Sequence, residues 1–198
     1  STELRRRFIE GDDSVVAHWL KEPCNFDGWR VDVANMTGRM GAEDLNEEVR
    51  QIIRRTMEDV NPDTVLLAES TNDAASDLQG DAWHGAMTYP SFTRPVWGWL
   101  TEPGDTAHVT ADGSVDPEAW FFGQPIGGIP RLSARDFARM TVRFTASIPW
   151  RIRLGNMNAL NTHDTARFRT HAPAENVPLA LALSVTLPGV PVVFAGDE

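Results

Sequence analysis

Residues 64–70 read TVLLAES, a short apolar run that ends on a glutamate and a serine. The run is too short for a helix and is apolar on both faces, which is typical of a parallel β-strand covered on each side. Residues 28–36 read GWRVDVANM and also predict a strand, although this one carries Arg30 and Asp32 two places apart. Side chains at positions i and i+2 of a strand point to the same side. We therefore expect these two charges to work as a pair.

Helical patterns alternate with the strand patterns along the chain. Residues 42–60 place apolar side chains at helical spacing and end at Asn61-Pro62, which stops a helix. An amphipathic helix is expected over 134–148. The remaining expected elements are helices over 1–21, 91–100 (interrupted by Pro95) and 177–187 (buried), and strands over 84–89, ending at 158–164, and over 190–196 (buried).

This alternation predicts an α/β protein with a parallel sheet. The charged residues lie where separate strands end: Asp32 in the first, Glu69 in the second, and His163-Asp164 in a later one. A doubly wound sheet gathers its ligands mainly at one switch point. A (β/α)8 barrel instead builds its active site from the carboxyl ends of several strands. Acidic groups on three strands therefore favour the (β/α)8 barrel as the fold class.

The composition is that of an ordinary globular domain. The chain has 198 residues, of which 41% are hydrophobic and 23% charged, with a net charge of −10. This charge argues against a nucleic-acid surface, which needs clustered Lys and Arg, and no apolar run approaches the length of a membrane span. The single cysteine, Cys24, allows no internal disulfide and favours a reducing compartment, so we expect a cytoplasmic protein. Residues 103–130 are rich in Gly, Asp and Pro and predict an irregular insertion.

Three carboxylates define the chemistry that we expect. Asp32, Glu69 and Asp164 would repel one another in one cleft, but Arg30 should keep Asp32 ionised, and the apolar run before Glu69 favours its neutral form. An ionised carboxylate beside a protonated one is the acid/base arrangement of glycoside hydrolysis. The alternative is a divalent metal site on an enolase-like barrel, for which we would expect a lysine base near a strand end. The only lysine is Lys21, in the first expected helix, which disfavours that alternative.

Four motifs in order resemble the α-amylase family of glycoside hydrolases, glycoside hydrolase family 13. GWRVDVANM, VLLAES and LNTHDTAR resemble its second, third and fourth conserved regions, and LPGVPVVFAGDE resembles its last barrel strand. WHGAMTYPSFTRPVW is similar to the sixth-strand region of the cyclomaltodextrinase and α-glucosidase branches. The resemblance runs from about residue 24 to residue 198. The positions that match the family pattern are Gly28, Trp29, Arg30, Asp32, Glu69, His163 and Asp164.

The resemblance implies a retaining mechanism through a covalent glycosyl–enzyme. It implies that Asp32 is the nucleophile, that Glu69 is the general acid and then the base, and that Asp164 binds the sugar hydroxyls. For a retaining enzyme the carboxyls of Asp32 and Glu69 should lie about 5–5.5 Å apart. The implied substrates are α-1,4-linked gluco-oligosaccharides, hydrolysed without an organic cofactor. A glucanotransferase or a trehalose-forming isomerase would use the same chemistry with a sugar as acceptor, and a non-catalytic barrel module or an inert fragment is the alternative of another class.

The resemblance also implies three substrate-binding residues. It implies that Arg30 orients Asp32, that His163 hydrogen-bonds the sugar, and that Arg167 contacts a hydroxyl or carboxylate. Simpler structural interpretations stand beside these roles. Arg30 and Asp32 could be only a structural ion pair, Glu69 could cap a helix that starts at Ser70 to Asp73, and His163-Asp164 could be a helix cap.

The sequence departs from the family in two ways. The first conserved motif, an Asp and an Asn-His at the end of the third strand, is missing, so we expect this chain to cover strands four to eight as the C-terminal part of a catalytic barrel. Such a half-barrel has open sheet edges, which we expect the missing N-terminal half or a second copy of the chain to cover. Residues 34–36 read Ala-Asn-Met where typical α-amylases have Lys-His, which favours the glucosidase and cyclomaltodextrinase branches. This segment gives no support for calcium.

Overall fold

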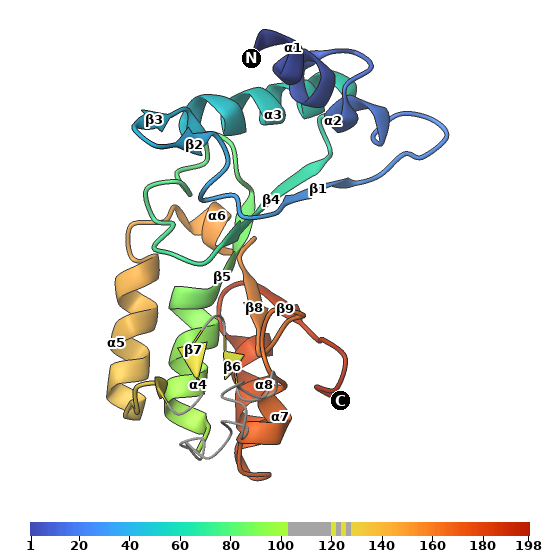
Figure 1. Ribbon diagram of the computed structural model, residues 1–198. Helices are drawn as coiled ribbons and strands as arrows, with labels where there is room; N and C mark the ends of the chain where they lie inside the picture. Colours follow the sequence, from blue (N-terminus) through green and yellow to red (C-terminus); the bar gives the residue numbers. More distant parts are fainter. Residues whose placement is uncertain (103–119, 122–123, 126–127) are drawn as a thin grey trace, which may run out of the picture. The chain divides into compact units, whose positions relative to one another are not determined.

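The computed structural model describes residues 1–102, 120–121, 124–125 and 128–198 (Figure 1). It consists of two compact units, each of which is described by itself. The first unit is Ser1–Met87 with Ser147–Asn156, and the second is Thr88–Ala146 with Met157–Glu198. Most of the insertion expected over 103–130 lies outside the described residues.

Five strands make the main sheet, and their order in the sheet is their order in the chain. They are β1 (Gly28–Val31), β4 (Val65–Ser70), β5 (Gly85–Thr88), β8 (Met157–Ala159) and β9 (Val190–Val192). Both β1–β4 and β8–β9 are parallel pairs. A doubly wound sheet would reverse its order at a switch point, whereas consecutive strands of a (β/α)8 barrel follow one another in this way. The predicted α/β fold class is therefore confirmed.

The start of β1 depends on a glycine. Gly28 lies opposite Val65 of β4 in the parallel register. A Cβ atom at this position would lie 2.0 Å from the carbonyl oxygen of Val65, and the backbone φ is +154°. Only glycine therefore lets β1 begin this close to β4, and the strand then runs on to Arg30 in register with Leu67.

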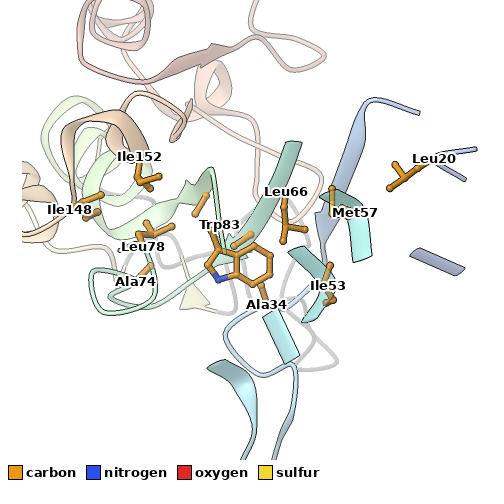
Figure 2. Packing of buried hydrophobic residues seen from close by; sticks show 12 residues of the cluster. Leu20, Ala34, Ile53, Met57, Leu66, Ala74, Leu78, Trp83, Ile148 and Ile152 are labelled. Carbon is orange, nitrogen blue, oxygen red and sulfur yellow. The ribbon is translucent and has the colours of Figure 1, made fainter. Parts of the chain in front are cut away.

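The long helix of the first unit is present as expected, but it starts later. Helix α3 covers Asn46–Val60 rather than 42–60, because β2 (Arg39–Met40) and β3 (Glu43–Asp44) form a short antiparallel pair just before it. Its apolar side packs into a core shared with β4, and Figure 2 shows this cluster. Ile148 and Ile152 complete it, the latter from the short helix α6 (Trp150–Arg153). The fully buried members include Met57, Leu66, Leu78 and Ala86.

The prediction of one helix over residues 1–21 is wrong. The structure has α1 (Thr2–Arg5), a π-helical segment η1 (Arg6–Glu10) and α2 (Val15–His18). Gly11 takes an extended conformation and ends the first helical stretch. Ser14 then starts α2, because its Oγ accepts a hydrogen bond from the Ala17 N–H at 3.3 Å.

The second unit packs its helices around a core of aromatic side chains. Trp97 is fully buried, and its ring contacts those of Phe121 and Phe168. The expected helix over 134–148 is α5 (Ala134–Thr145), which begins with a capping box between Ser133 and Asp136. The other elements of this unit are η2 (Tyr89–Thr93), α4 (Arg94–Leu100), β6 (Trp120–Phe121), β7 (Gln124–Pro125), α7 (Phe168–His171) and α8 (Asn176–Thr186).

The expected interruption at Pro95 is a change of helix type, because the π-helical η2 ends at Thr93 and α4 begins at Arg94 with Pro95 in its first turn. Two other expectations for the second unit need correction. Helix α8 is not a buried helix, since only Ala180 and Ser184 are buried and Val185 is 64% exposed. Strand β9 is not buried either, and Val193 just after it is 68% exposed. Apolar composition predicted burial, but the described residues cover only one side of these elements.

No helix in the described part of the chain combines the length and the apolar character that crossing a membrane requires.

Candidate active site

One guanidinium joins the two acids of the first unit. Arg30 lies in β1, and its Nη1 contacts Oδ1 of Asp32 just after the strand. Its Nη2 lies 2.9 Å from Oε1 of Glu69, near the end of β4. The sequence assigned Arg30 to Asp32 alone, so its contact with Glu69 is a new finding. The side chain of Glu69 is only 5% exposed, whereas that of Asp32 is 74% exposed. The structure thus brings together three of the predicted site residues.

The turn after Asp32 is bound to the end of β4 by two backbone donors. The N–H of Val33 donates to Oε2 of Glu69 at 2.7 Å. The N–H of Ala34 donates to the main-chain oxygen of the same residue at 3.1 Å. Val33 has a φ of +44°, in the left-handed region that valine rarely adopts. The backbone around the predicted nucleophile is therefore fixed directly onto the predicted acid.

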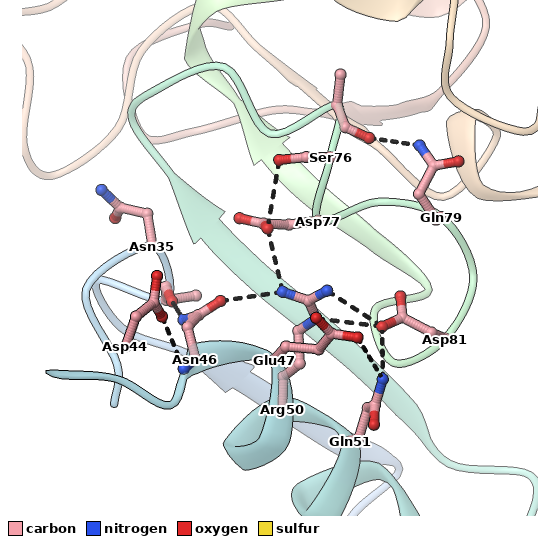
Figure 3. Close-up of polar contacts among 12 residues, drawn as sticks. Asn35, Asp44, Asn46, Glu47, Arg50, Gln51, Ser76, Asp77, Gln79 and Asp81 are labelled. Carbon is pink, nitrogen blue, oxygen red and sulfur yellow. Dashed lines mark hydrogen bonds and ion pairs between the residues drawn. The ribbon is translucent and has the colours of Figure 1, made fainter. Parts of the chain in front are cut away.

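A buried polar network holds the far side of this turn (Figure 3). Asn46, at the start of α3, is almost fully buried, and its amide donates to the carbonyl oxygens of Ala34 at 2.8 Å and Thr37 at 2.7 Å. Arg50, one helical turn later, donates to the Asn46 side-chain oxygen at 3.1 Å and pairs with two further carboxylates. These are Asp77 and Asp81, each 3.1 Å from a guanidinium nitrogen. The network connects α3 to the turn that follows Asp32.

His163, Asp164 and Arg167 lie together in the second unit, in the segment between β8 and α7. Nε2 of His163 is 3.2 Å from Oδ2 of Asp164, and the two side chains are 63% and 40% exposed. Arg167 donates to the carbonyl oxygen of Thr162 at 3.1 Å and lies 4.6 Å above the ring of Phe194. The three residues thus follow a strand end, as predicted. That Asp164 joins Asp32 and Glu69 in one site stays a prediction.

A buried acid that the sequence did not single out supports this segment. Asp197 is 4% exposed, accepts a hydrogen bond from the Phe194 N–H at 2.8 Å, and also accepts one from the Asn161 amide. Asn161 in turn accepts a hydrogen bond from the Phe168 N–H at 3.3 Å. Burial raises the pKa of the Asp197 carboxyl, although these hydrogen bonds act in the opposite direction. Asp197 therefore links the residues after β9 to the residues after β8.

Two of the simpler structural interpretations are wrong. The described residues between β4 and β5 form turns and bends without a helix, so Glu69 caps none. Helix α7 begins at Phe168 with Arg167 as its N-cap residue, so Asp164 is not its cap. The ion pair between Arg30 and Asp32 does exist, but it also includes Glu69.

Among the residues that the structure describes, no three His, Cys, Asp or Glu side chains are grouped in a way that could hold a metal ion. The expectation of a site without metal stays a prediction.

Sequence comparison relates nearly the whole chain to cyclomaltodextrinases and maltogenic amylases. It is 28% identical over 183 residues to a cyclomaltodextrinase from a Bacillus species, which covers 91% of this chain and 26% of that enzyme. It is 25% identical to a maltogenic alpha-amylase from Bacillus acidopullulyticus, over 93% of this chain and 25% of that one. The chain thus spans about a quarter of the length of these curated relatives. No protein-family model matches it.

Solved structures show the same relationship in three dimensions. A debranching enzyme from Nostoc punctiforme superimposes with a TM-score of 0.70 at 27% identity, over 92% of this chain and 34% of that one. The cyclic α-maltosyl-(1→6)-maltose hydrolase from Arthrobacter globiformis gives a TM-score of 0.61 at 27% identity, over 93% of this chain and 34% of that one. The resemblance that the motifs indicated is confirmed: the chain is related to the glycoside hydrolases of the α-amylase family.

Proposed function

We propose that this chain carries the catalytic carboxylates of a retaining α-glycosidase that hydrolyses α-1,4-linked gluco-oligosaccharides. The observation that carries the proposal is the guanidinium of Arg30 shared between Asp32 and Glu69 at the ends of two adjacent parallel strands. Glycoside hydrolysis uses a pair of carboxyl groups close together, and a separation of about 5–5.5 Å between Asp32 and Glu69 stays our prediction for a retaining enzyme. The names of the relatives agree with a substrate made of α-linked glucose units.

In the proposed double displacement, a carboxylate oxygen of Asp32 attacks the anomeric carbon as the glycosidic C–O bond breaks. Glu69 gives its proton to the leaving oxygen, and in the second step it takes a proton from the water that displaces Asp32. Asp164 and His163 bind hydroxyls of the same sugar, and Arg167 adds a contact from the same segment. Exposure of Asp32 and burial of Glu69 suit a nucleophile that meets substrate directly and an acid that is held in place.

We further propose that the chain acts together with the remaining strands of a (β/α)8 barrel, on the same polypeptide or on a second one. The relatives are three to four times as long as the matched segment. Exposed apolar side chains at the last strand of the sheet support this, because they offer a surface that further elements could cover. Val190 in β9 and Val193 just after it are two of them. Adding the missing half to the isolated chain should therefore restore turnover.

The experiment traps the glycosyl–enzyme in the full-length enzyme. Incubation with 5-fluoro-α-glucosyl fluoride should add one sugar to the peptide that contains Asp32, as seen by mass spectrometry, and Asp32→Asn should abolish the label. The first product of maltotriose cleavage should be the α-anomer by NMR. A β-anomer or a label on another residue would overturn the proposal. Glucose and maltose as products of maltotriose mean hydrolysis, and longer products mean transfer to a sugar. Undiminished turnover by Asp32→Asn would mean that this acid has no catalytic use and that the chain is a non-catalytic module.

A further inference from the structure

Val33 adopts a backbone conformation that its own side chain does not explain. Only two non-glycine residues in the described part of the chain have a positive φ: Asn25 at +48° and Val33 at +44°. Asparagine tolerates the left-handed region, but a β-branched residue is strained there. The Val33 side chain is 46% exposed, so packing does not account for its position. Such strain persists only where the surroundings impose it, and it is common at catalytic sites.

The surroundings that impose it are hydrogen bonds on both sides of the turn. Val33 donates its N–H to Oε2 of Glu69 at 2.7 Å, and Ala34 donates to the main-chain oxygen of Glu69 at 3.1 Å. On the other side, the buried Asn46 amide binds the carbonyl oxygens of Ala34 and Thr37. The turn is therefore held between β4 and α3, and the left-handed conformation at Val33 directs its N–H at the carboxyl of Glu69.

The two oxygens of Glu69 are left in different environments. Oε2 accepts the aligned N–H of Val33. Oε1 lies 2.9 Å from Nη2 of Arg30, yet among the described residues Nη2 has no partner with hydrogen-bond geometry, so this contact is an ion pair without an aligned hydrogen bond. Each oxygen of Glu69 therefore faces a different donor, and the aligned N–H of Val33 is the contact that fixes how the carboxyl group is rotated.

We infer that Val33 is a positioning residue for the general acid, because its strained backbone directs an N–H at Oε2 and so fixes the rotation of the Glu69 carboxyl. The inference rests on the proposed function, in which Glu69 is that acid. As the glycosidic bond breaks, the proton passes from the Glu69 carboxyl to the leaving oxygen, and the carboxylate later takes a proton from the attacking water. The N–H of Val33 holds the carboxyl in the same rotation in both steps.

The test removes the N–H alone. In the full-length enzyme, the amide of Val33 is replaced by an ester through incorporation of α-hydroxyisovaleric acid, which keeps the side chain. The matched control is the same exchange at Ala34, whose N–H binds only the main-chain oxygen of Glu69. Each variant is assayed with maltotriose, whose leaving group needs a proton, and with α-maltosyl fluoride, whose leaving group does not. We expect the Val33 ester to lower kcat/KM on maltotriose about 10-fold or more and on the fluoride less than about 3-fold.

Three comparisons decide the outcome. The Ala34 ester should change kcat/KM by the same factor on both substrates. A Val33 ester that also changes both values equally would overturn the inference. Should the ester variants fail to fold, Val33→Gly, which keeps the N–H and tolerates the left-handed conformation, should retain the wild-type ratio of the two kcat/KM values; a ratio shifted against maltotriose would overturn the inference. Glu69→Gln must also leave kcat/KM on the fluoride, which reports only the first step, close to the wild-type value, although its kcat falls because the second step needs the base. If it does not, the proposed function itself fails, which distinguishes the two failures.

Discussion

The two groups of predicted site residues are built in opposite ways. At the ends of β1 and β4, charged side chains bind one another, and Glu69 is 5% exposed beneath Arg30. In the segment after β8, His163 and Asp164 are 63% and 40% exposed and contact each other, while backbone hydrogen bonds and a buried acid hold the segment itself. The first group is thus fixed through its reactive side chains and the second through its main chain. Substitutions should therefore cost stability in the first group and mainly activity in the second.

The largest expected effect comes from removing the shared cation. Arg30→Met leaves Asp32 and the buried Glu69 without the cation between them, so we expect the free energy of unfolding to fall by about 3 kcal/mol, with loss of turnover in the full-length enzyme. Arg167→Met is the matched change in the second group and should cost about 1 kcal/mol or less, because it removes one carbonyl hydrogen bond and a ring contact. Urea unfolding of both variants measures the difference.

Arg30→Lys sharpens this comparison. It keeps the positive charge but has one nitrogen in place of the two that contact Asp32 and Glu69, so its stability should lie between those of the wild type and Arg30→Met. Equal stability of Arg30→Met and Arg167→Met would remove the distinction between the two groups.

The next effect tests whether the turn after Asp32 needs its second anchor. Asn46→Ala leaves the buried carbonyl oxygen of Ala34 and the partly buried one of Thr37 without this donor, and we expect a loss of about 2 kcal/mol together with reduced turnover. Gln51→Ala, on the exposed edge of the same network, serves as control and should stay within about 0.5 kcal/mol of the wild type. An Asn46→Ala variant with full activity would show that the contacts to Glu69 suffice.

A smaller, pH-dependent effect is expected in the second group. Because burial raises the pKa of Asp197 above its ordinary value, the folded state favours the protonated carboxyl. That contribution is present below the unfolded value of about 4 and is lost as the pH rises through the folded value. The wild type should therefore lose stability relative to Asp197→Asn when unfolding is measured at pH 7 instead of pH 4. A constant difference between the two proteins would contradict the raised pKa.

The smallest effect belongs to the first unit and has the opposite sign. Burial lowers the pKa of His84, and the charge of Arg54 adds to this; its Nδ1 accepts the Leu66 N–H at 2.8 Å. The folded state thus prefers neutral His84, so stability is lost as the pH falls through the unfolded value of about 6.5. His84→Asn, which keeps an acceptor and does not titrate, should show a flatter curve between pH 7.5 and 5.5. An identical curve for both proteins would exclude His84 as the cause.

The elements and the charged residues were predictable because they depend on local patterns. The apolar run of β4, the helical spacing of α3 and the polar residues at strand ends are visible without neighbours, and they indicated the fold class and the contact between Arg30 and Asp32. The burial of β9 and α8 was predicted wrongly, because composition says how apolar a segment is and not what covers it.

The residues that support the site left weaker signals. A left-handed Val33 cannot be read from the sequence, since valine has no preference for that conformation. Asn46 and Arg50 are spaced one helical turn apart, beside the apolar stripe of α3 at Val49 and Ile53, which is a weak sign of a buried polar pair. Asp197 stood in a recognised motif, but its burial and its bond to Asn161 depend on contacts between distant parts of the chain.

The single guanidinium between two acids has a consequence for the order of events in the proposed reaction. While Asp32 is a free anion, Arg30 divides its charge between that anion and Glu69. Once Asp32 becomes a neutral ester of the sugar, Glu69 is the only anion that Arg30 contacts in this pair of acids. This happens at the step when Glu69 has just given up its proton. The same cation would thus prepare the nucleophile in the first half of the cycle and steady the newly formed base in the second.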